Sequence, residues 1–248
     1  MRAASPATCA RESGESMKDD PIAGVLLAAG TSSRMGRNKL FVELGGKSVL
    51  RRAVDTAAAA GLEPILVVLG HEPERAQEEL DGVECTTVLN AHYARGMNTS
   101  LRAGIAAVPE SARGAVVMLA DMPFVGAAMI RELVERWRAA NSPLALSTYG
   151  EVIAPPTLYG RRLFAEVLAL DAEGCGKRVV NRHREEAVEV AWPAWALTDL
   201  DLPEDVDRVR AQLGEGFARA ASAAEGERPA GGRGSPAAGQ QGFSKGQT

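Results

Sequence analysis

The sequence predicts an α/β protein: a three-layer α/β/α domain built around a mostly parallel sheet. Short apolar segments of strand length alternate along the chain with segments of helical periodicity, the pattern of parallel strands joined by helices. The apolar segments are continuous, as expected of strands that are covered on both faces. Two of them run directly into glycine or aspartate, and sheets of this kind gather ligands at the carboxyl ends of their strands.

The first half of the chain contains the clearest elements. Ile22–Ala28 is an apolar run that leads into a glycine and predicts a buried strand. Ser48 is a typical N-cap for a helix that runs through Leu50 and Val54 and closes at Gly61. The next predicted elements are the strand Pro64–Leu69, a helix from Pro73 to Leu80 with proline in its first position, the strand Glu84–Leu89 and the helix Thr99–Val108.

The second half continues the alternation. Ala115–Ala120 is another buried apolar strand, and it stops at Asp121. Ala127–Ala139 is amphipathic and predicts a helix with one face on the core. Leu144–Ala154 is typical of a hairpin that turns at Gly150. The remaining predicted elements are the helix Arg161–Leu170, the strands Val188–Trp192 and Ala196–Asp201, and the helix Pro203–Leu213.

The two ends of the chain differ in composition from the middle. Residues 1–20 show no periodicity, and residues 215–248 are rich in alanine and glycine. Such segments bury too little apolar surface to offset the entropy lost on ordering. We therefore expect a disordered N-terminal extension over 1–20, a folded domain over 21–214 and a disordered tail over 215–248.

The composition excludes several classes of function. With 28 Lys and Arg against 32 Asp and Glu in 248 residues, the net charge is −4, which argues against broad binding to nucleic acid. The sequence has no apolar run near the roughly 20 residues of a membrane span. The three cysteines are widely spaced and form neither a disulfide framework nor a zinc pattern. We expect a soluble, cytoplasmic protein with no nucleic-acid or membrane partner.

The strongest local signal is the loop that follows the first strand, Leu26–Lys39. It carries Gly30 and Gly36, which allow close backbone approach to a ligand, and backbone N–H groups that can bind phosphate oxygens. Arg34 and Lys39 would neutralise the charge of such a ligand. The glycine spacing fits neither a Walker A loop nor a Rossmann G-x-G-x-x-G. On composition alone, a plain surface turn is an equal alternative.

Acidic residues follow two of the predicted strands. Asp121 comes directly after a buried strand, and Asp201 lies in the acidic segment Asp199–Asp205. Mg²⁺ is bound in proteins by one or two carboxylates together with substrate phosphates, so two converging strand ends could hold it. The alternative readings are structural: Asp121 caps a turn before Pro123, and Asp201 caps the last helix.

A third segment, Asn90–Leu101, has a glycine, Gly96, just before a predicted helix. A helix N-terminus can bind an anion, although this signal alone is unspecific.

Together these segments resemble the molybdenum cofactor cytidylyltransferases of the MobA/MocA-like NTP transferase family, which have a Rossmann-like, GT-A-like fold. The first loop has the form L-x-A-x-G-x-x-x-R-M-G-x-x-K, Leu119–Pro123 has the form of the metal motif, and Asn90–Leu101 has the form N-x-x-x-x-x-G-M-x-x-S-L. The resemblance implies catalytic roles for Arg34, Lys39 and Asp121, metal binding by Asp121 and Asp201, and nucleotide contacts by Leu27, Ala28, Ala29, Gly30, Arg34, Lys39, Gly96, Ser100 and Leu101.

The resemblance implies a Mg²⁺-dependent transfer of a nucleoside monophosphate to a phosphorylated acceptor, with release of pyrophosphate. Ala28-Ala29-Gly30 matches the cytidylyl-transferring branch, so CTP is the expected nucleotide, molybdopterin the acceptor and a molybdoenzyme the recipient. Alternatives are a GTP-using guanylyltransferase, a sugar- or polyol-phosphate nucleotidyltransferase, and a protein that delivers a bound cofactor. Leu202 departs from the threonine of the second acidic motif, and Ala154–Pro156 lacks the Gly-His of the acceptor region. Gly174–Arg178 is expected to contact the phosphate of the pterin.

Overall fold

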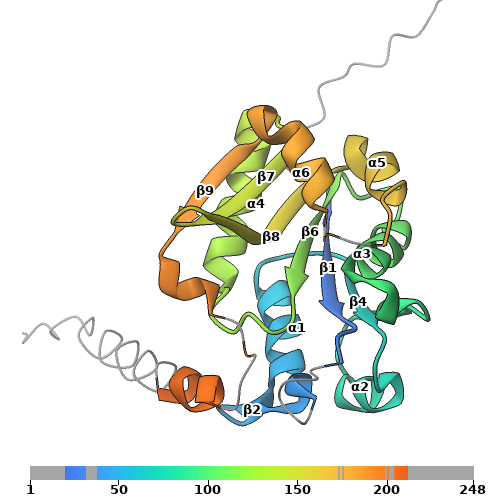
Figure 1. Ribbon diagram of the computed structural model, residues 1–248, viewed down its shortest axis with the longest axis vertical. Helices are drawn as coiled ribbons and strands as arrows, with labels where there is room; N and C mark the ends of the chain where they lie inside the picture. The colour runs from blue at the N-terminus through green and yellow to red at the C-terminus, as the bar shows by residue number, and fades with distance from the viewer. Residues whose placement is uncertain are drawn as a thin grey trace, which may run out of the picture. The chain divides into compact units, whose positions relative to one another are not determined.

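A seven-stranded sheet forms the centre of the structure, a computed structural model of the protein (Figure 1). In spatial order the strands are β5 (Thr86–Leu89), β4 (Ile65–Leu69), β1 (Ile22–Ala28), β6 (Gly114–Leu119), β8 (Val152–Gly160), β7 (Leu144–Tyr149) and β9 (Val188–Trp192). All neighbours pair in parallel except β8, which runs antiparallel to β6 and β7. The predicted mostly parallel sheet is confirmed. A separate two-stranded ribbon consists of β2 (Glu43–Leu44) and β3 (Lys47–Ser48).

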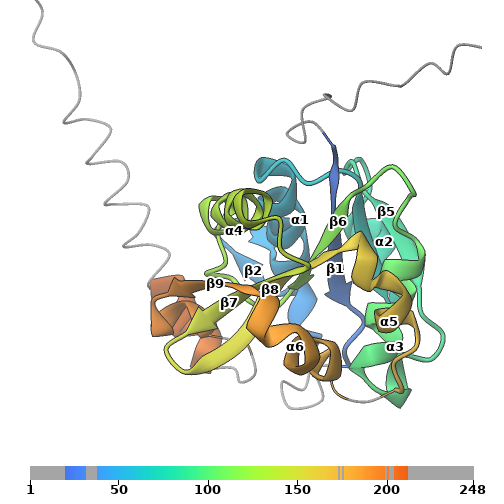
Figure 2. The same ribbon diagram turned by 90° about the horizontal axis from the view of Figure 1, so that it is seen from above.

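Helices cover both faces of the sheet, as Figure 2 shows from above. One face is covered by α1 (Val49–Ala59), α2 (Pro73–Glu79) and α4 (Ala127–Ala140), and the other by α3 (Met97–Ala106), α5 (Phe164–Leu168) and α6 (Lys177–His183). Short 3-10 turns lie between these elements: η1 (Lys39–Phe41), η2 (Tyr93–Arg95), η3 (Arg161–Leu163), η4 (Arg184–Glu186) and η5 (Ala194–Leu197). Residues 204–211 are also helical.

The core is divided by the sheet into two apolar layers. Every residue of β1 is buried, and successive side chains point to opposite faces. Leu26 therefore packs with the layer under α1 and α4, whereas Val25 and Leu27 pack with the layer under α3 and α5. This two-sided burial explains why the strands read as continuous apolar runs.

The strand directions place six strand ends at one edge of the sheet. β1, β4, β5 and β6 are mutually parallel, and β7 and β9 run the same way because β7 is antiparallel to β8, which is antiparallel to β6. We call this side the carboxyl edge. The connections that leave it begin at residues 29, 70, 90, 120, 150 and 193.

The structure describes residues 20–31, 38–172, 174, 176–198, 200 and 204–211. The chain divides into two compact units, Met1–Arg210 and Ala211–Thr248, and all described residues except Ala211 belong to the first. The described helices are all too short or too polar to cross a membrane. The segments predicted to be disordered, 1–20 and 215–248, lie outside the described residues except for Asp20, and their disorder stays a prediction.

Most predicted elements occur where the sequence places them. The strands Ile22–Ala28 and Val188–Trp192 are confirmed at both ends, and Ser48 caps α1 by accepting a hydrogen bond from the Arg51 amide. The strand expected over Ala196–Asp201 is wrong in its described part. Ala196 and Leu197 lie in η5, because the chain turns at Pro193, whose carbonyl accepts a hydrogen bond from the Ala196 amide at 3.0 Å.

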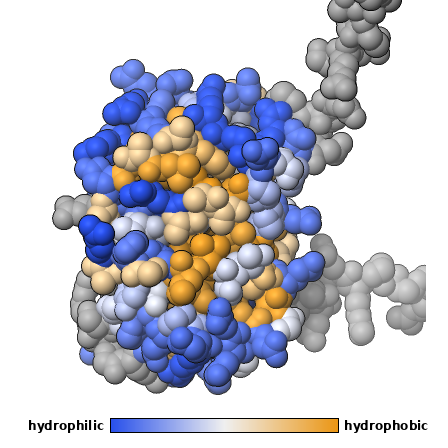
Figure 3. Space-filling view, turned by 90° about the vertical axis from the view of Figure 1, so that its right-hand side faces the viewer, coloured by the Kyte–Doolittle hydropathy of each residue, from blue (hydrophilic) through white to orange (hydrophobic). Residues whose placement is uncertain are grey.

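Apolar side chains gather on the face that carries α2, α3 and α5 (Figure 3). Leu89, Met97 and Leu168 are large exposed apolar residues on β5, α3 and α5, the elements of this side. Polar side chains surround the patch in the same view. β5 is an edge strand, so this face combines exposed apolar surface with unpaired backbone groups.

Candidate active site

The segment after β1 presents its backbone at the carboxyl edge. Leu27, Ala28 and Ala29 are buried, and Gly30 is exposed. The Leu27 carbonyl accepts from the Ala120 amide at 3.2 Å, which ties the end of β1 to the end of β6. A methyl group at Gly30 would meet no atom of the described residues within 4 Å, so their packing does not require a glycine there. Free space above a fixed backbone is what close approach of a ligand needs.

Lys39, the cation of the Leu26–Lys39 loop that the structure describes, forms an ion pair with Asp121 just after β6. Lys39 begins η1, and its Nζ lies 2.5 Å from Oδ2 of Asp121. Both side chains are mostly enclosed, with exposed fractions of 15% for Lys39 and 19% for Asp121. Screening by water is weaker for such a pair than for an exposed one. Two residues predicted from separate motifs thus meet at one point.

The second acidic segment also reaches this point. Leu200 is fully buried, and its amide donates to the carbonyl oxygen of Asp121 at 3.2 Å. This backbone bond fixes the strand end and the later segment side by side. Asp201, the next residue, lies outside the described residues, as does Arg34 in the first loop.

The Asn90–Leu101 segment forms a turn held by the side chain of Asn90. Its Nδ2 donates to Thr99 Oγ1 at 2.8 Å and to Ser100 Oγ at 2.9 Å, and its Oδ1 accepts from the His92 amide at 2.9 Å. Gly96 precedes α3 with a φ of 128°, a conformation that favours glycine. Ser100 and Leu101 are buried, so the structure places them beneath the turn and only Gly96 nearer its surface.

Sequence reasoning missed Glu72, which follows β4 at the carboxyl edge. Glu72 has a left-handed backbone with φ 50° and ψ 52°, unusual for a residue with a long side chain. Its Oε2 accepts from Nδ2 of Asn38 at 3.0 Å, which holds the residue preceding Lys39. This hydrogen bond lowers the pKa of Glu72, and the nearby Arg75 acts in the same direction. The signal for this residue is positional: it leaves a central strand at the edge where the motifs gather.

Gly70 was also missed, and it allows three segments to approach closely. A Cβ at Gly70 would lie 2.6 Å from Cβ and Cγ of Tyr93 and 2.8 Å from Cβ of Ala29. The Tyr93 ring in turn lies beside His71, with ring centroids 6.3 Å apart. The close packing of Ala29, Gly70 and Tyr93 joins the ends of β1 and β4 to the Asn90 turn.

The predicted phosphate-binding turn Gly174–Arg178 contacts α3 through Asn98. Oδ1 of the buried Asn98 accepts from the Gly176 amide at 2.7 Å. Arg178 is exposed and makes a two-point ion pair with Asp171 at 3.0 and 3.1 Å. The turn is therefore attached to α3, and Arg178 is paired with Asp171 on the surface. Cys175 lies outside the described residues.

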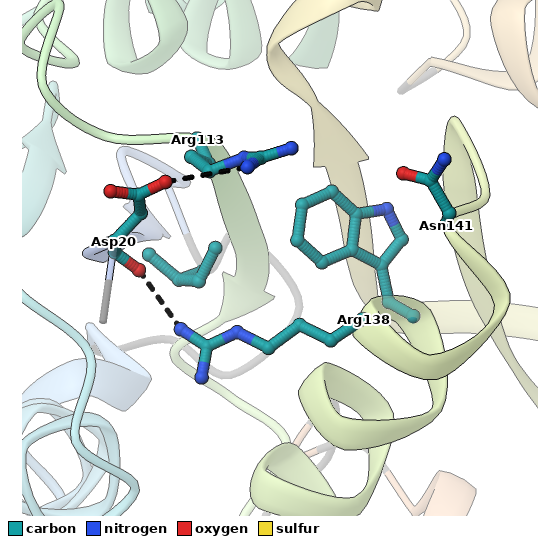
Figure 4. Close-up of a pocket in the computed structure, with 6 residues that line it drawn as sticks. Asp20, Arg113, Arg138 and Asn141 are labelled. Carbon is teal, nitrogen blue, oxygen red and sulfur yellow. Dashed lines mark hydrogen bonds and ion pairs between the residues drawn. The ribbon is translucent and has the colours of Figure 1, made fainter. Parts of the chain in front are cut away.

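Cations at the opposite edge of the sheet have structural partners (Figure 4). Arg113 Nη1 contacts Oδ2 of Asp20 at 3.3 Å, and Arg138 Nη2 donates to the Asp20 carbonyl at 2.9 Å. With Asn141 they line a small pocket below the start of β1. These bonds attach the start of the sheet to α4, and the residues that line the pocket include none of the predicted site residues that the structure describes.

The donor set at the carboxyl edge suits a cation that is completed by a substrate. Among the described residues, there is no cluster of three or more His, Cys, Asp or Glu side chains able to hold a metal ion. Of the residues that the structure describes, Asp121 offers a carboxylate at the junction with Lys39 and Leu200. One or two carboxylates plus phosphate oxygens and water is how Mg²⁺ is usually bound in enzymes that act on nucleotides.

The doubly covered, mostly parallel sheet, with lysine, aspartate and a glycine turn at its carboxyl edge, defines an α/β nucleotidyltransferase domain. Residues 24–188 match the MobA-like NTP transferase domain, and the chain belongs to that family. This confirms the family resemblance drawn from the motifs.

Known proteins of similar sequence and structure agree with this assignment. The chain is 29% identical to the purine catabolism protein PucB of Bacillus subtilis, over 78% of this chain and 98% of that protein. It is 31% identical to a probable molybdenum cofactor guanylyltransferase of Opitutus terrae, over 76% and 95%. Among solved structures, Rv0371c of Mycobacterium tuberculosis H37Rv is 28% identical, with a TM-score of 0.70 over 79% of this chain and 100% of that one. A complex of Rv0371c with manganese has also been solved, with a TM-score of 0.64, 26% identity and coverage of 77% and 98%.

Proposed function

We propose that this protein transfers CMP from CTP to a phosphorylated acceptor of the molybdopterin type and releases pyrophosphate. The observation that carries the proposal is the contact of Lys39 with Asp121 at 2.5 Å. It joins the loop whose motif is associated with the triphosphate to the strand end whose motif is associated with the metal.

The chemistry needs little beyond positioning and charge neutralisation. A phosphate oxygen of the acceptor attacks the α-phosphorus of CTP in line, the bond from that phosphorus to the bridging oxygen breaks, and pyrophosphate leaves with the electron pair. A phosphomonoester is already anionic near neutral pH, so no general base has to remove a proton. Lys39, with Arg34, offsets the charge that builds on the β- and γ-phosphates.

Asp121 and Asp201 are the residues that would hold Mg²⁺. When bound, the ion supplies charge neutralisation between the phosphates that react. Because the Lys39 ammonium lies beside the Asp121 carboxylate, it would also be close to a phosphate brought there by a bound Mg²⁺. The manganese complex of Rv0371c supports a divalent cation in this family.

The sequence Ala28-Ala29-Gly30 supports CTP over GTP. Ala29 is buried and lies against Gly70, so the backbone of this segment has little freedom to adapt to a different base. GTP is the second candidate, because a relative with 31% identity is named as a guanylyltransferase.

A nucleotide panel tests the proposal directly. The full chain is incubated with molybdopterin, Mg²⁺ and CTP, GTP, ATP or UTP, and pyrophosphate release is followed. We expect kcat/KM for CTP to exceed that for GTP by at least about 100-fold. Chelation with EDTA should abolish release, and added Mg²⁺ or Mn²⁺ should restore it. A preference for GTP would replace the cytidylyl assignment with the guanylyl one.

Acceptor controls separate the other readings. A sugar phosphate or polyol phosphate in place of molybdopterin should give only background release. Efficient turnover with those acceptors would contradict the pterin assignment. A chain that retains the cofactor through gel filtration but releases no pyrophosphate with any nucleotide would instead be a delivery protein.

A further inference from the structure

Two aromatic side chains lie in the segments that lead to the acidic junction, Phe124 in the connection after β6 and Trp195 in η5 after β9. Trp195 has an exposed fraction of 59%, whereas Trp192 at the end of β9 is partly buried against the core. Phe124 packs against the core and makes a T-shaped contact with Trp195. The ring centroids are 5.6 Å apart and the planes meet at 84°. Such an edge-to-face contact supports one ring and leaves a flat face of the other available.

Trp195 is carried on a rigid turn. Its carbonyl oxygen accepts from Thr198 Oγ1 at 2.8 Å, and the Ala196 amide donates to the Pro193 carbonyl at 3.0 Å. Ala196 is buried and anchors the turn, while the indole of Trp195 projects from it together with the small side chains of Pro193 and Ala194. An exposed ring on a fixed backbone loses little entropy when a ligand stacks on it.

Both aromatic residues belong to segments that meet at Asp121. Phe124 lies in the turn just after Asp121, a turn closed by a hydrogen bond from the Val125 amide to the Met122 carbonyl at 3.2 Å. Trp195 lies shortly before Leu200, whose amide binds the Asp121 carbonyl. In Figure 1 the turn that carries Trp195, η5, is coloured orange and follows the end of β9, near the loop that leaves β6. The two segments that carry the aromatic pair therefore both lead to Asp121, in the proposed reaction centre.

We infer that Trp195, supported by Phe124, stacks on a planar heteroaromatic ring of the acceptor and selects acceptors that have one. The inference rests on the proposed function and adds the residue that determines acceptor specificity. A fused ring of pterin or purine size matches a single indole face, whereas a protein partner needs about 800 Å² on its own side of the interface. One indole and one phenyl edge provide far too little surface for the latter.

The test uses binding without turnover and then turnover. Calorimetric titration of the full chain with a pterin phosphomonoester, in the absence of nucleotide, gives the acceptor Kd. We expect Trp195→Leu to raise this Kd by about 10-fold to 100-fold, the loss typical of removing one aromatic stacking partner. Trp195→Phe should recover most of the affinity. Leu168→Ala, at an exposed apolar residue on α5, is the matched control and should leave the Kd unchanged.

Steady-state kinetics then separate this inference from the proposed function. In Trp195→Leu the KM for the pterin acceptor should rise with the Kd, while the KM for CTP stays within about 2-fold. If the wild type binds the pterin through Trp195 but no nucleotide yields pyrophosphate, the proposed function fails and the stacking role stands. An unchanged acceptor Kd in Trp195→Leu overturns the stacking role, as does a change in oligomeric state on gel filtration, which would assign the indole to a second copy of the chain.

Discussion

The two halves of the sheet are built differently, and they differ in how they would bind a ligand. The half formed by β5, β4, β1 and β6 is wholly parallel, and the connections that follow its strands carry Lys39, Asn90 and Asp121. The half formed by β8, β7 and β9 contains the antiparallel strand and a register shift between Leu146 and Ser147. At the carboxyl edge, the turn after β9 in this second half presents the exposed side chain of Trp195.

The irregular half compensates for its broken ladder with side chains. Ser147 Oγ donates to the Pro156 carbonyl at 2.7 Å, and Tyr149 OH donates to the Pro155 carbonyl at 2.9 Å. Proline supplies no amide to a sheet, so these hydroxyls bind carbonyls in a stretch where the regular ladder is interrupted. We therefore propose different roles for the two halves of the sheet. The parallel half binds the charged nucleotide, and the irregular half contacts the acceptor.

The largest effect should come from removing the carboxylate at the boundary of the two halves. Asp121→Ala should lower kcat by about 100-fold to 1,000-fold, because a charged group at the reacting phosphates is lost. The free energy of unfolding should fall by about 1–3 kcal/mol, since one partner of a mostly enclosed ion pair is removed, a much smaller loss than that of kcat in relative terms. Pyrophosphate release and urea unfolding, measured on the same preparations, check both numbers.

The chain offers a matched control for that variant. Lys47 and Asp55 make a Lys–Asp contact of the same length, 2.5 Å, at an exposed position on β3 and α1. Asp55→Ala removes a Lys–Asp contact of the same length, at a more exposed position, and should leave kcat unchanged. Comparable activity in the two variants would show that Asp121 has only a structural role.

A smaller effect should follow from adding a methyl group at Gly70, in the parallel half of the sheet. Gly70→Ala places a methyl group 2.6 Å from Tyr93 and 2.8 Å from Ala29, so the ends of β1 and β4 must separate. We expect a loss of about 1–3 kcal/mol in the free energy of unfolding. The KM for CTP should rise by about 10-fold or more, because the shift displaces the Ala29–Gly30 backbone.

Gly126→Ala is the control for this substitution. A Cβ at Gly126 meets no atom within 4 Å, and the backbone φ of −98° suits alanine. Its cost should be about 0.5 kcal/mol, from the change at the helix N-cap, with no change in KM. The predicted outcome for Gly70→Ala would be contradicted by a raised acceptor KM with an unaltered CTP KM, since that would place the Gly70 segment on the acceptor side.

The parallel half could be predicted from sequence because local residues determine it. An apolar run, a capping serine and a proline at a helix start each specify a local conformation, and β1, α1 and α2 occur accordingly. The meeting of Lys39 with Asp121 followed from the rule that parallel strand ends share one edge.

The remaining features depend on contacts that no local pattern encodes. Glu72 was missed because its importance comes from a left-handed backbone and from Asn38, a partner far away in the sequence. Trp195 was missed because the apolar segment around it is typical of a strand, whereas Pro193 turns the chain into η5. In both cases the distant partner, not the residue type, determines the role.

The smallest effect we predict concerns the support of the irregular half and depends on pH. A hydrogen bond from the His183 ring to Glu166, 2.8 Å long, raises the pKa of His183, and Glu186 at 3.2 Å adds to the shift. A raised pKa means that the stabilisation is complete below the ordinary histidine pKa of about 6.5 and is lost as the pH rises through the higher folded value. Relative to His183→Gln, the wild type should therefore lose up to about 1 kcal/mol in the free energy of unfolding between pH 6 and pH 8.5. Urea unfolding at both pH values measures this, with His92→Gln, at an exposed histidine outside the cluster, as the control. His183 ends α6 and is followed by η4 and the start of β9, at the edge of the sheet opposite the carboxyl edge. The KM for CTP should therefore not follow the same pH course, and a parallel change in both quantities would break the proposed separation of the two halves.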